Sequence, residues 1–321
     1  MMEIGSFLEL QFPKGLEYYR QKNDIIRLNT GRAAIWHAFR LTGADRIWIP
    51  YYQCDSVRDF LCKKGVDVLY YSMDRHFNPV DLHPDEDDAV LLVNYFGVMS
   101  ASRMAELAHP YPHAIIDNCQ AFFSAPLAGL YNVYSARKFV GVPDGAYVLG
   151  PDAELFSSSY PQGYSSDTAQ FLLQRIEYGC EGKGYEARMI NEHRIDSEDV
   201  MKMSPLTRAI LDGTDYLEIC EKRRANFSYA HSLFGRVNQI DAMRHYDGET
   251  VPMVYPLVVE DDALLNRLLQ AKHFQGHWWS YLLDEVPADS FEYWMSRYMI
   301  PVTIDQRYGR RELDYLADII L

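Results

Sequence analysis

The strongest constraint on the fold is a series of short apolar runs that alternate with helical patterns over the first 150 residues. The runs are rich in Val, Ile, Leu and Tyr and lie at 46–50, 66–71, 89–95, 113–117, 132–135 and 146–149. The run 89–95 opens with five consecutive apolar residues, which suits a strand buried on both faces. Helical patterns separate the runs at 33–41, 56–64 and 101–107. This alternation predicts an α/β domain with a mainly parallel sheet.

The remaining segments have weaker patterns. Residues 1–28 are expected to form an irregular lead-in, and the segments 157–159 and 179–184 to be mobile surface segments. A long helix is predicted over 206–234, followed by a strand at 251–259 and helices at 262–272 and 311–320. We therefore predict a large domain over residues 1–204 and a smaller C-terminal α/β domain over 205–321.

Composition narrows the functional classes. The net charge of -14 argues against non-specific binding to nucleic acid, which needs a basic face. No apolar run approaches the ~20 residues that span a bilayer, and the N-terminus lacks the pattern of a secretory signal, so a cytoplasmic protein without a membrane partner is expected. The five cysteines form no C-x-x-C pair and share no ligand spacing with the histidines. Reduced, mostly buried thiols and no metal site are therefore expected.

In parallel sheets, ligands bind at the carboxyl ends of the strands, so polar residues just after each strand are the candidates for chemistry. The first candidate is Thr30-Gly31-Arg32, a small-residue turn that opens a helix. The exposed N–H groups of a helix start bind phosphate well, and glycine permits close approach. The alternative is an ordinary capped helix.

The second candidate is Asp117, which ends the apolar run 113–117. A buried acid is costly unless it has a cationic partner, and a protonated pyridine nitrogen would be such a partner. The alternative is a helix N-cap.

The third candidate is Lys138, which follows the run 132–135 in an apolar turn rich in glycine and proline. Burial in such a turn would remove water from the amine, lower its pKa and make it nucleophilic. The alternative is a surface lysine beside Arg137.

A phosphate turn, an acid and a lysine, in this order and each at a strand end, are what a pyridoxal 5'-phosphate (PLP) site needs. With these residues the chain resembles the DegT/DnrJ/StrS family of PLP-dependent aminotransferases. The matching stretches, in order, are L-N-T-G-R-A-A-I near 28–35, I-W-I-P-Y-Y near 47–52, N-Y-F-G at 94–97, I-I-D-N-C-Q-A at 115–121, Y-S-A-R-K at 134–138, L-T-R-A-I-L at 206–211, E-K-R-R-A-N at 221–226 and P-V-T-I-D-Q-R-Y at 301–308.

The resemblance implies the fold of type I PLP-dependent transferases, with a mainly parallel seven-stranded-type sheet flanked by helices in the large domain. It implies that Lys138 is the Schiff-base lysine, that Asp117 pairs with the pyridinium nitrogen and that Gln120 lies close to the phenolic oxygen of the cofactor. It further implies that Gly31, Arg32 and Ser135 contact the phosphate. Members are typically homodimers with both sites at the subunit interface.

The chain also departs from the family pattern. Cys54 stands where the family places the aromatic residue that stacks on the cofactor, and Tyr51 or Tyr52 would take over this role; we assign it to Tyr52. The asparagine that the family supplies from the neighbouring subunit is missing at its usual place, and Asn191 is the nearest substitute.

The resemblance implies an aminotransferase that moves an amino group from an amino acid such as glutamate to a keto-sugar, nucleotide-linked in many members. Lys183 and Arg188, in a predicted flexible loop over 179–188, could close over a diphosphate. The basic run 222–224 is expected to be solvated or paired, since Glu218 and Glu221 precede Lys222 and Arg224 at helical spacing.

Two alternatives stay open. One is another PLP enzyme, a lyase, racemase or sugar dehydratase; the dehydratase branch replaces the lysine, so the presence of Lys138 speaks against it. The other is a non-catalytic relative that binds PLP or a sugar nucleotide.

Overall fold

A computed structural model describes residue 4 and residues 6–20 and 24–321 of the chain. Its main feature is an eight-stranded sheet with the strand order β1-β8-β7-β6-β5-β2-β3-β4. The strands are β1 (Ile25–Leu28), β2 (Arg46–Pro50), β3 (Asp67–Met73), β4 (Pro79–Val80), β5 (Ala89–Val93), β6 (Ala114–Asn118), β7 (Tyr131–Ser135) and β8 (Ala146–Leu149). The predicted α/β fold with a mainly parallel sheet is confirmed, with one strand more than the seven expected.

The sheet is parallel through its centre. Strands β7, β6, β5, β2 and β3 pair in parallel, whereas β8 runs antiparallel to both of its neighbours and β4 runs antiparallel to β3. The carboxyl ends of the five parallel strands therefore lie at one edge, where ligands bind in sheets of this kind.

Apolar residues alternate between the two faces of the sheet, because successive side chains of a strand point to opposite sides. Leu91 and Ile115 share one buried cluster with residues of α1 (Gly31–Thr42) and α2 (Asp55–Lys63). Leu92 and Ile116 share another with residues of α3 (Ala101–Ala108) and of the C-terminal region. Both faces are covered, which explains why these strands are apolar throughout.

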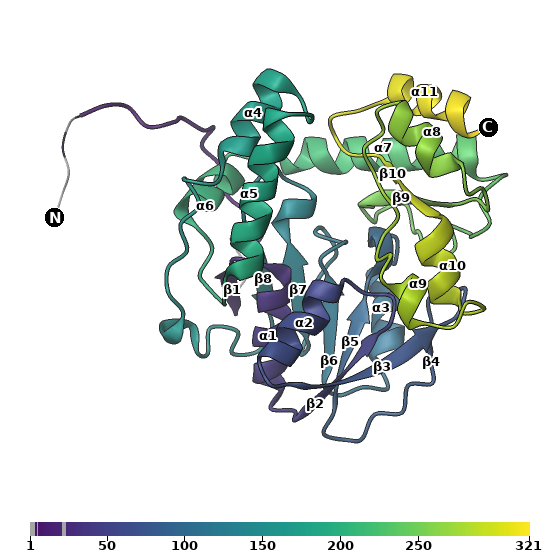
Figure 1. The fold of residues 1–321 in the computed structure, drawn as a ribbon. Helices are drawn as coiled ribbons and strands as arrows, with labels where there is room; N and C mark the ends of the chain where they lie inside the picture. The colour runs from purple at the N-terminus through teal and green to yellow at the C-terminus, as the bar shows by residue number, and fades with distance from the viewer. Residues whose placement is uncertain (1–3, 5, 21–23) are drawn as a thin grey trace.

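Residues 205–321, which we call the C-terminal region, carry helices α6 to α11 and a two-stranded antiparallel sheet. In Figure 1 the small sheet and α8–α11 lie together at one side, and α4–α6 lie at the other. The elements are α6 (Pro205–Asp212), α7 (Tyr216–Phe234), β9 (Val254–Val258), α8 (Leu264–Gln270), α9 (Leu282–Glu285), α10 (Phe291–Tyr298), β10 (Met299–Thr303) and α11 (Arg310–Ile320). Within the described residues, no helix is long and apolar enough to cross a membrane.

Three expectations about the local structure were wrong. The lead-in 1–28 contains strand β1, although its residues 1–3, 5 and 21–23 lie outside the described part. The long helix 206–234 is two helices, because the chain turns at Gly213 and Asp215 caps α7 by accepting a hydrogen bond from the Glu218 N–H. Of the five free cysteines, Cys119 alone is buried.

The segment 179–188 is not a flexible loop. Helix α4 (Gln170–Tyr178) ends just before Gly179, and α5 (Lys183–Ser197) begins at Lys183. The ammonium of Lys183 lies 5.1 Å from the ring centroid of Tyr178, and Arg188 lies 4.0 Å from Glu192 one helical turn away. The two basic residues expected to close over a diphosphate are therefore held on a helix.

Candidate active site

The thiol of Cys119 marks the point where the predicted site residues meet. It lies just after β6 and is buried, and burial together with the charge of Asp117 raises the pKa of Cys119 well above its usual value. The charge of Lys138 acts on the same thiol in the opposite direction, and Cys54 also influences it. Charged or polar groups that end or follow β2, β6 and β7 thus all act electrostatically on one buried sulfur atom.

Asp117 is 4% exposed and is held by two hydrogen bonds. Its Oδ1 accepts from the backbone N–H of Cys119 at 2.9 Å, and its Oδ2 accepts from Nε2 of Gln53 at 3.0 Å. No ion pair to Asp117 occurs among the residues that the structure describes. A buried carboxylate with neutral partners alone is costly, so this position is suited to a cationic ligand.

Lys138 closes a short 3-10 turn, η2 (Ala136–Lys138), directly after β7. Its side chain is exposed, so the expected burial of the amine in an apolar turn is not what the structure shows. Exposure leaves Nζ accessible to a ligand at the sheet edge. Ser135, at the end of β7, is buried and pairs with Ala146 of β8.

The start of α1 packs directly on the same thiol. A Cβ atom at Gly31 would lie 2.8 Å from the Cys119 Sγ, closer than packed atoms tolerate. Thr30 caps the helix by accepting a hydrogen bond from the Ala33 N–H, which leaves the N–H groups of Gly31 and Arg32 without partners among the described residues. Two free N–H groups at a helix start suit an anion.

The Arg32 side chain points elsewhere. Its guanidinium donates to the Ile195 carbonyl and to Asp196 at the end of α5. Arg32 can therefore contribute its backbone N–H to the site, but its guanidinium charge lies elsewhere.

Gln120, three residues after Asp117, supports a strained turn. Its Oε1 accepts a hydrogen bond from the Phe96 N–H at 2.8 Å. Phe96 has a φ of +58°, a conformation that bulky residues rarely adopt. Gly97 follows with a φ of +68°, and a Cβ atom there would lie 2.3 Å from the Gln120 carbonyl oxygen.

Tyr52 is not brought to this cluster. Its ring is fully buried and packs edge-on against Trp279, with 4.4 Å between the ring centroids. Its hydroxyl has no hydrogen-bond partner in the described part of the chain. Tyr51 stacks on Tyr70 at 5.0 Å. The stacking role for Tyr52 stays a prediction.

Asn191 has a role within its own chain. Its Nδ2 donates to the Pro143 carbonyl at 2.9 Å, in the turn that follows Lys138. In the same turn Asp144 is fully buried, and burial raises its pKa although Thr207 and Ser204 donate hydrogen bonds to it.

Solved structures resemble the whole chain, although no protein-family model and no curated protein matches the sequence. The sugar aminotransferase CalS13 from Micromonospora echinospora matches with a TM-score of 0.61 and 16% identity, over 92% of this chain and 86% of that one. A DegT DnrJ EryC1 StrS aminotransferase from Brucella abortus matches with 0.62 and 14%, over 94% and 86%. The E. coli GDP-4-keto-6-deoxy-D-mannose-3-dehydratase, with bound hydrated PLP, matches with 0.63 and 15%, over 94% and 88%.

The chain has the fold of these enzymes. This confirms the fold that the resemblance to the DegT/DnrJ/StrS family implied.

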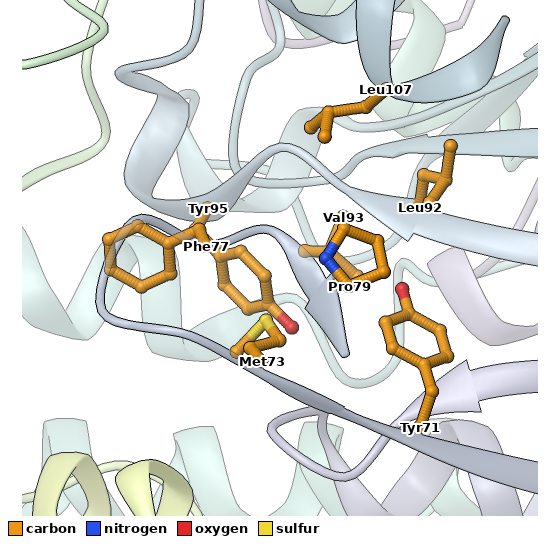
Figure 2. A pocket seen from close by; sticks show the side chains of 8 residues that line it. All are labelled: Tyr71, Met73, Phe77, Pro79, Leu92, Val93, Tyr95 and Leu107. Carbon is orange, nitrogen blue, oxygen red and sulfur yellow. The ribbon is translucent and has the colours of Figure 1, made fainter. Parts of the chain in front are cut away.

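Figure 2 shows a cavity elsewhere in the molecule. Its interior volume is about 10 Å³, room for about one water molecule. Eight side chains line it, among them Tyr71, Tyr95 and Leu107, and none of the predicted site residues is among them. The cavity is therefore a packing void in the core and not the site.

Sequence reasoning missed two residues of the site. Gln53 comes shortly after β2 and Asp117 lies near the end of β6, so the position of Gln53 at the same edge could have been inferred from the sequence. Cys119 was seen only as one of five thiols, and nothing in the sequence shows that α1 packs on it.

Proposed function

We propose that this chain is a PLP-dependent aminotransferase that moves an amino group from an amino acid to a keto-sugar. The observation that carries the proposal is Asp117, a buried carboxylate with no cationic partner among the described residues. Near it lies the buried thiol of Cys119, on which the charge of Lys138 acts and against which the start of α1 packs. A ligand with a cationic ring nitrogen, an aldehyde and a phosphate matches these three features.

The residues present suit PLP. Asp117 would hold the pyridinium proton, and the N–H groups of Gly31 and Arg32, with Ser135, would hold the phosphate. Gln120 would lie near the phenolic oxygen, whereas stacking by Tyr52 would require its buried ring to move away from Trp279. When bound, PLP supplies an aldehyde for the amino group and a ring that accepts an electron pair.

Lys138 would bind the cofactor through Nζ and later carry a proton at the same atom. Its exposed side chain can reach the sheet edge from the backbone turn that holds it. Asp117 would keep the ring nitrogen protonated, because its carboxylate is fixed by two hydrogen bonds and has no competing cation among the described residues.

The proposed amino acceptor is inferred from the similarity of fold. The similar structures include a sugar aminotransferase and an enzyme of a GDP-linked keto-deoxy-sugar, so a keto-sugar, nucleotide-linked, is the proposed second substrate. We also propose a homodimer, a large PLP-binding domain over 1–204, a smaller domain over 205–321 and a cytoplasmic location.

A half-reaction tests the function. The protein is loaded with PLP, mixed with glutamate, and followed by absorbance as the cofactor passes to its pyridoxamine form. The pyridoxamine form is then offered nucleotide-linked keto-sugars beside pyruvate, oxaloacetate and 2-oxoglutarate. We expect the keto-sugars to restore the original spectrum.

The control is Lys138→Ala together with borohydride reduction of the loaded wild type. Peptide mapping should place the reduced cofactor on Lys138 and leave Lys183, an exposed lysine on α5, unlabelled. A spectrum restored by small keto acids alone would replace the sugar with an amino-acid substrate. A protein that takes up no PLP would remove the enzyme proposal altogether.

A further inference from the structure

Phe139, the residue directly after Lys138, is held from the C-terminal region at two points. Its backbone carbonyl accepts a hydrogen bond from Nε2 of Gln306 at 2.8 Å. Its ring lies under the guanidinium of Arg223, with 4.5 Å from the guanidinium carbon to the ring centroid. Both contacts link segments far apart in the sequence.

Arg223, on α7, is itself held by three hydrogen bonds. It donates through Nε to Oε1 of Gln306 at 3.1 Å, and through one terminal nitrogen to the carbonyls of Met253 at 2.8 Å and Pro252 at 3.3 Å. It is 2% exposed and forms no ion pair in the described part of the chain, contrary to the expected solvated or paired side chain. Lys222, one residue earlier, does pair with Glu218 at 2.7 Å as expected.

A buried charge satisfied by neutral oxygens is costly for stability. Burial lowers the pKa of Arg223 to about 10, with the charge of Asp305 opposing this effect, so the group still carries its charge at neutral pH. A leucine or methionine at this place would pack at lower cost, which favours a role for Arg223 beyond stability.

The same arginine reaches the other side of the site. Met253, whose carbonyl it holds, donates its N–H to the Phe96 carbonyl at 2.7 Å. The Phe96 N–H in turn donates to Oε1 of Gln120 at 2.8 Å. One continuous hydrogen-bond chain therefore connects the turn after Lys138 with the side chain of Gln120.

We propose that Arg223 and Gln306 are positioning residues that hold the Lys138 turn and Gln120 at a fixed separation across the sheet edge. This inference rests on the proposed function. The Lys138 side chain is long and exposed, so the position of Nζ depends on where the backbone of the turn holds it. A displacement of about 1 Å at a reacting group can lower a rate on the order of 10²-fold.

Gln306→Leu tests the proposal, with Gln275→Leu as the matched control. Gln275 also lies in the C-terminal region and donates a side-chain hydrogen bond, to Thr303 Oγ1, but does not touch the Lys138 turn. In the protein without added cofactor, Gln306→Leu should speed amide hydrogen exchange in residues 136–142 about 10-fold. Gln275→Leu should leave that exchange unchanged.

In the PLP-loaded protein, Gln306→Leu should lower kcat on the order of 10-fold to 100-fold and leave the KM for the amino donor within about threefold. Gln306→Glu keeps the acceptor for Arg223 but loses the donor to the Phe139 carbonyl, so it should behave like Gln306→Leu. Arg223→Met should add faster exchange near Phe96, which Arg224→Met, on the same helix but bonded to the Glu249 carbonyl, should not.

Unchanged exchange in residues 136–142 of the folded Gln306→Leu protein overturns the inference, whatever the enzyme does. Faster exchange with an unchanged kcat in a PLP-active protein overturns it also, because the turn would then move without consequence. If the wild type binds no PLP, the proposed function fails. The exchange experiment still tests whether the hydrogen bond from Gln306 to Phe139 stabilises the Lys138 turn.

Discussion

The carboxyl edge of the large sheet and the helix pair α4–α5 differ sharply in how they bury their side chains. At the edge, Gln53, Asp117 and Gln120 are all less than 5% exposed although they are polar. On α4 no residue is buried, and the apolar Leu173 and Ile176 are 58% and 82% exposed. Polar side chains are buried at the sheet edge, whereas apolar side chains are exposed on α4.

This contrast separates a region whose buried groups find partners within one chain from a region whose apolar surface is left exposed. At the sheet edge Gln53, Asp117 and Gln120 each have hydrogen-bond partners from their own chain, and Asp117 lacks a cationic partner among the described residues. The apolar residues exposed on α4 and α5 have no such cover among the described residues, and exposed patches of this kind mark interaction surfaces. A second copy of the chain, as in the proposed homodimer, is the partner we expect there.

Asp117→Asn is the sharpest test of the edge and should have the largest effect. The amide keeps the shape of the carboxylate but removes its charge, so the ring nitrogen of PLP would no longer be held protonated. We expect turnover to fall on the order of 10²–10³-fold. Unfolding by urea should show a loss of about 1–2 kcal/mol, since one of two accepted hydrogen bonds becomes a mismatch.

Asp59→Asn, an exposed position on α2, is the control and should change neither quantity. Equal turnover of Asp117→Asn and wild type, both with bound PLP, would remove Asp117 from its proposed role.

The strands of the edge were predictable from sequence because both of their faces are buried. The apolar runs placed β2 and β8 at the observed residues and β6 within one residue. Helix α5 was missed for the opposite reason. Its buried positions recur at helical spacing but are Gly184, Ala187, Asn191 and Ile195, a pattern with little hydrophobic contrast.

The site was predictable in its order along the chain but not in its contacts. Asp117 lies at the end of its strand and Lys138 just after another, and these positions in their apolar surroundings suggested both residues. The hydrogen bond from Gln306 to Phe139 joins residues 167 positions apart, and no local pattern encodes it. Likewise, Arg223 could not be told from its neighbours Lys222 and Arg224 before the fold showed which face of α7 is buried.

Ile176→Glu tests the other region. A charge in the middle of a closed apolar interface is costly to desolvate, so we expect the dimer dissociation constant to rise at least ~100-fold, equivalent to about 3 kcal/mol. Sedimentation velocity over a range of concentrations measures it, with circular dichroism to show that the fold is kept.

Leu217→Glu is the matched control, because Leu217 is similarly exposed, at 77%, on a different helix. A wild type that sediments as an active monomer, or an Ile176→Glu protein that stays a dimer, would contradict an interface through α4.

Gly31→Ala should give the smallest of the three effects and tests how tightly the start of α1 packs at the sheet edge. Alanine has a higher helix propensity than glycine, so on propensity alone the change would stabilise α1. Its Cβ, however, would lie 2.8 Å from the buried Cys119 Sγ, and such overpacking costs about 1–3 kcal/mol. We expect a net loss of about 1–2 kcal/mol in the free energy of unfolding, measured in urea.

Gly141→Ala, whose Cβ would meet Leu172 at an ordinary 3.7 Å, is the control and should lose less stability. Cys119→Ala removes the sulfur, so Gly31→Ala made in that background should cost little. Additive costs in the double variant would show that the start of α1 does not depend on Cys119.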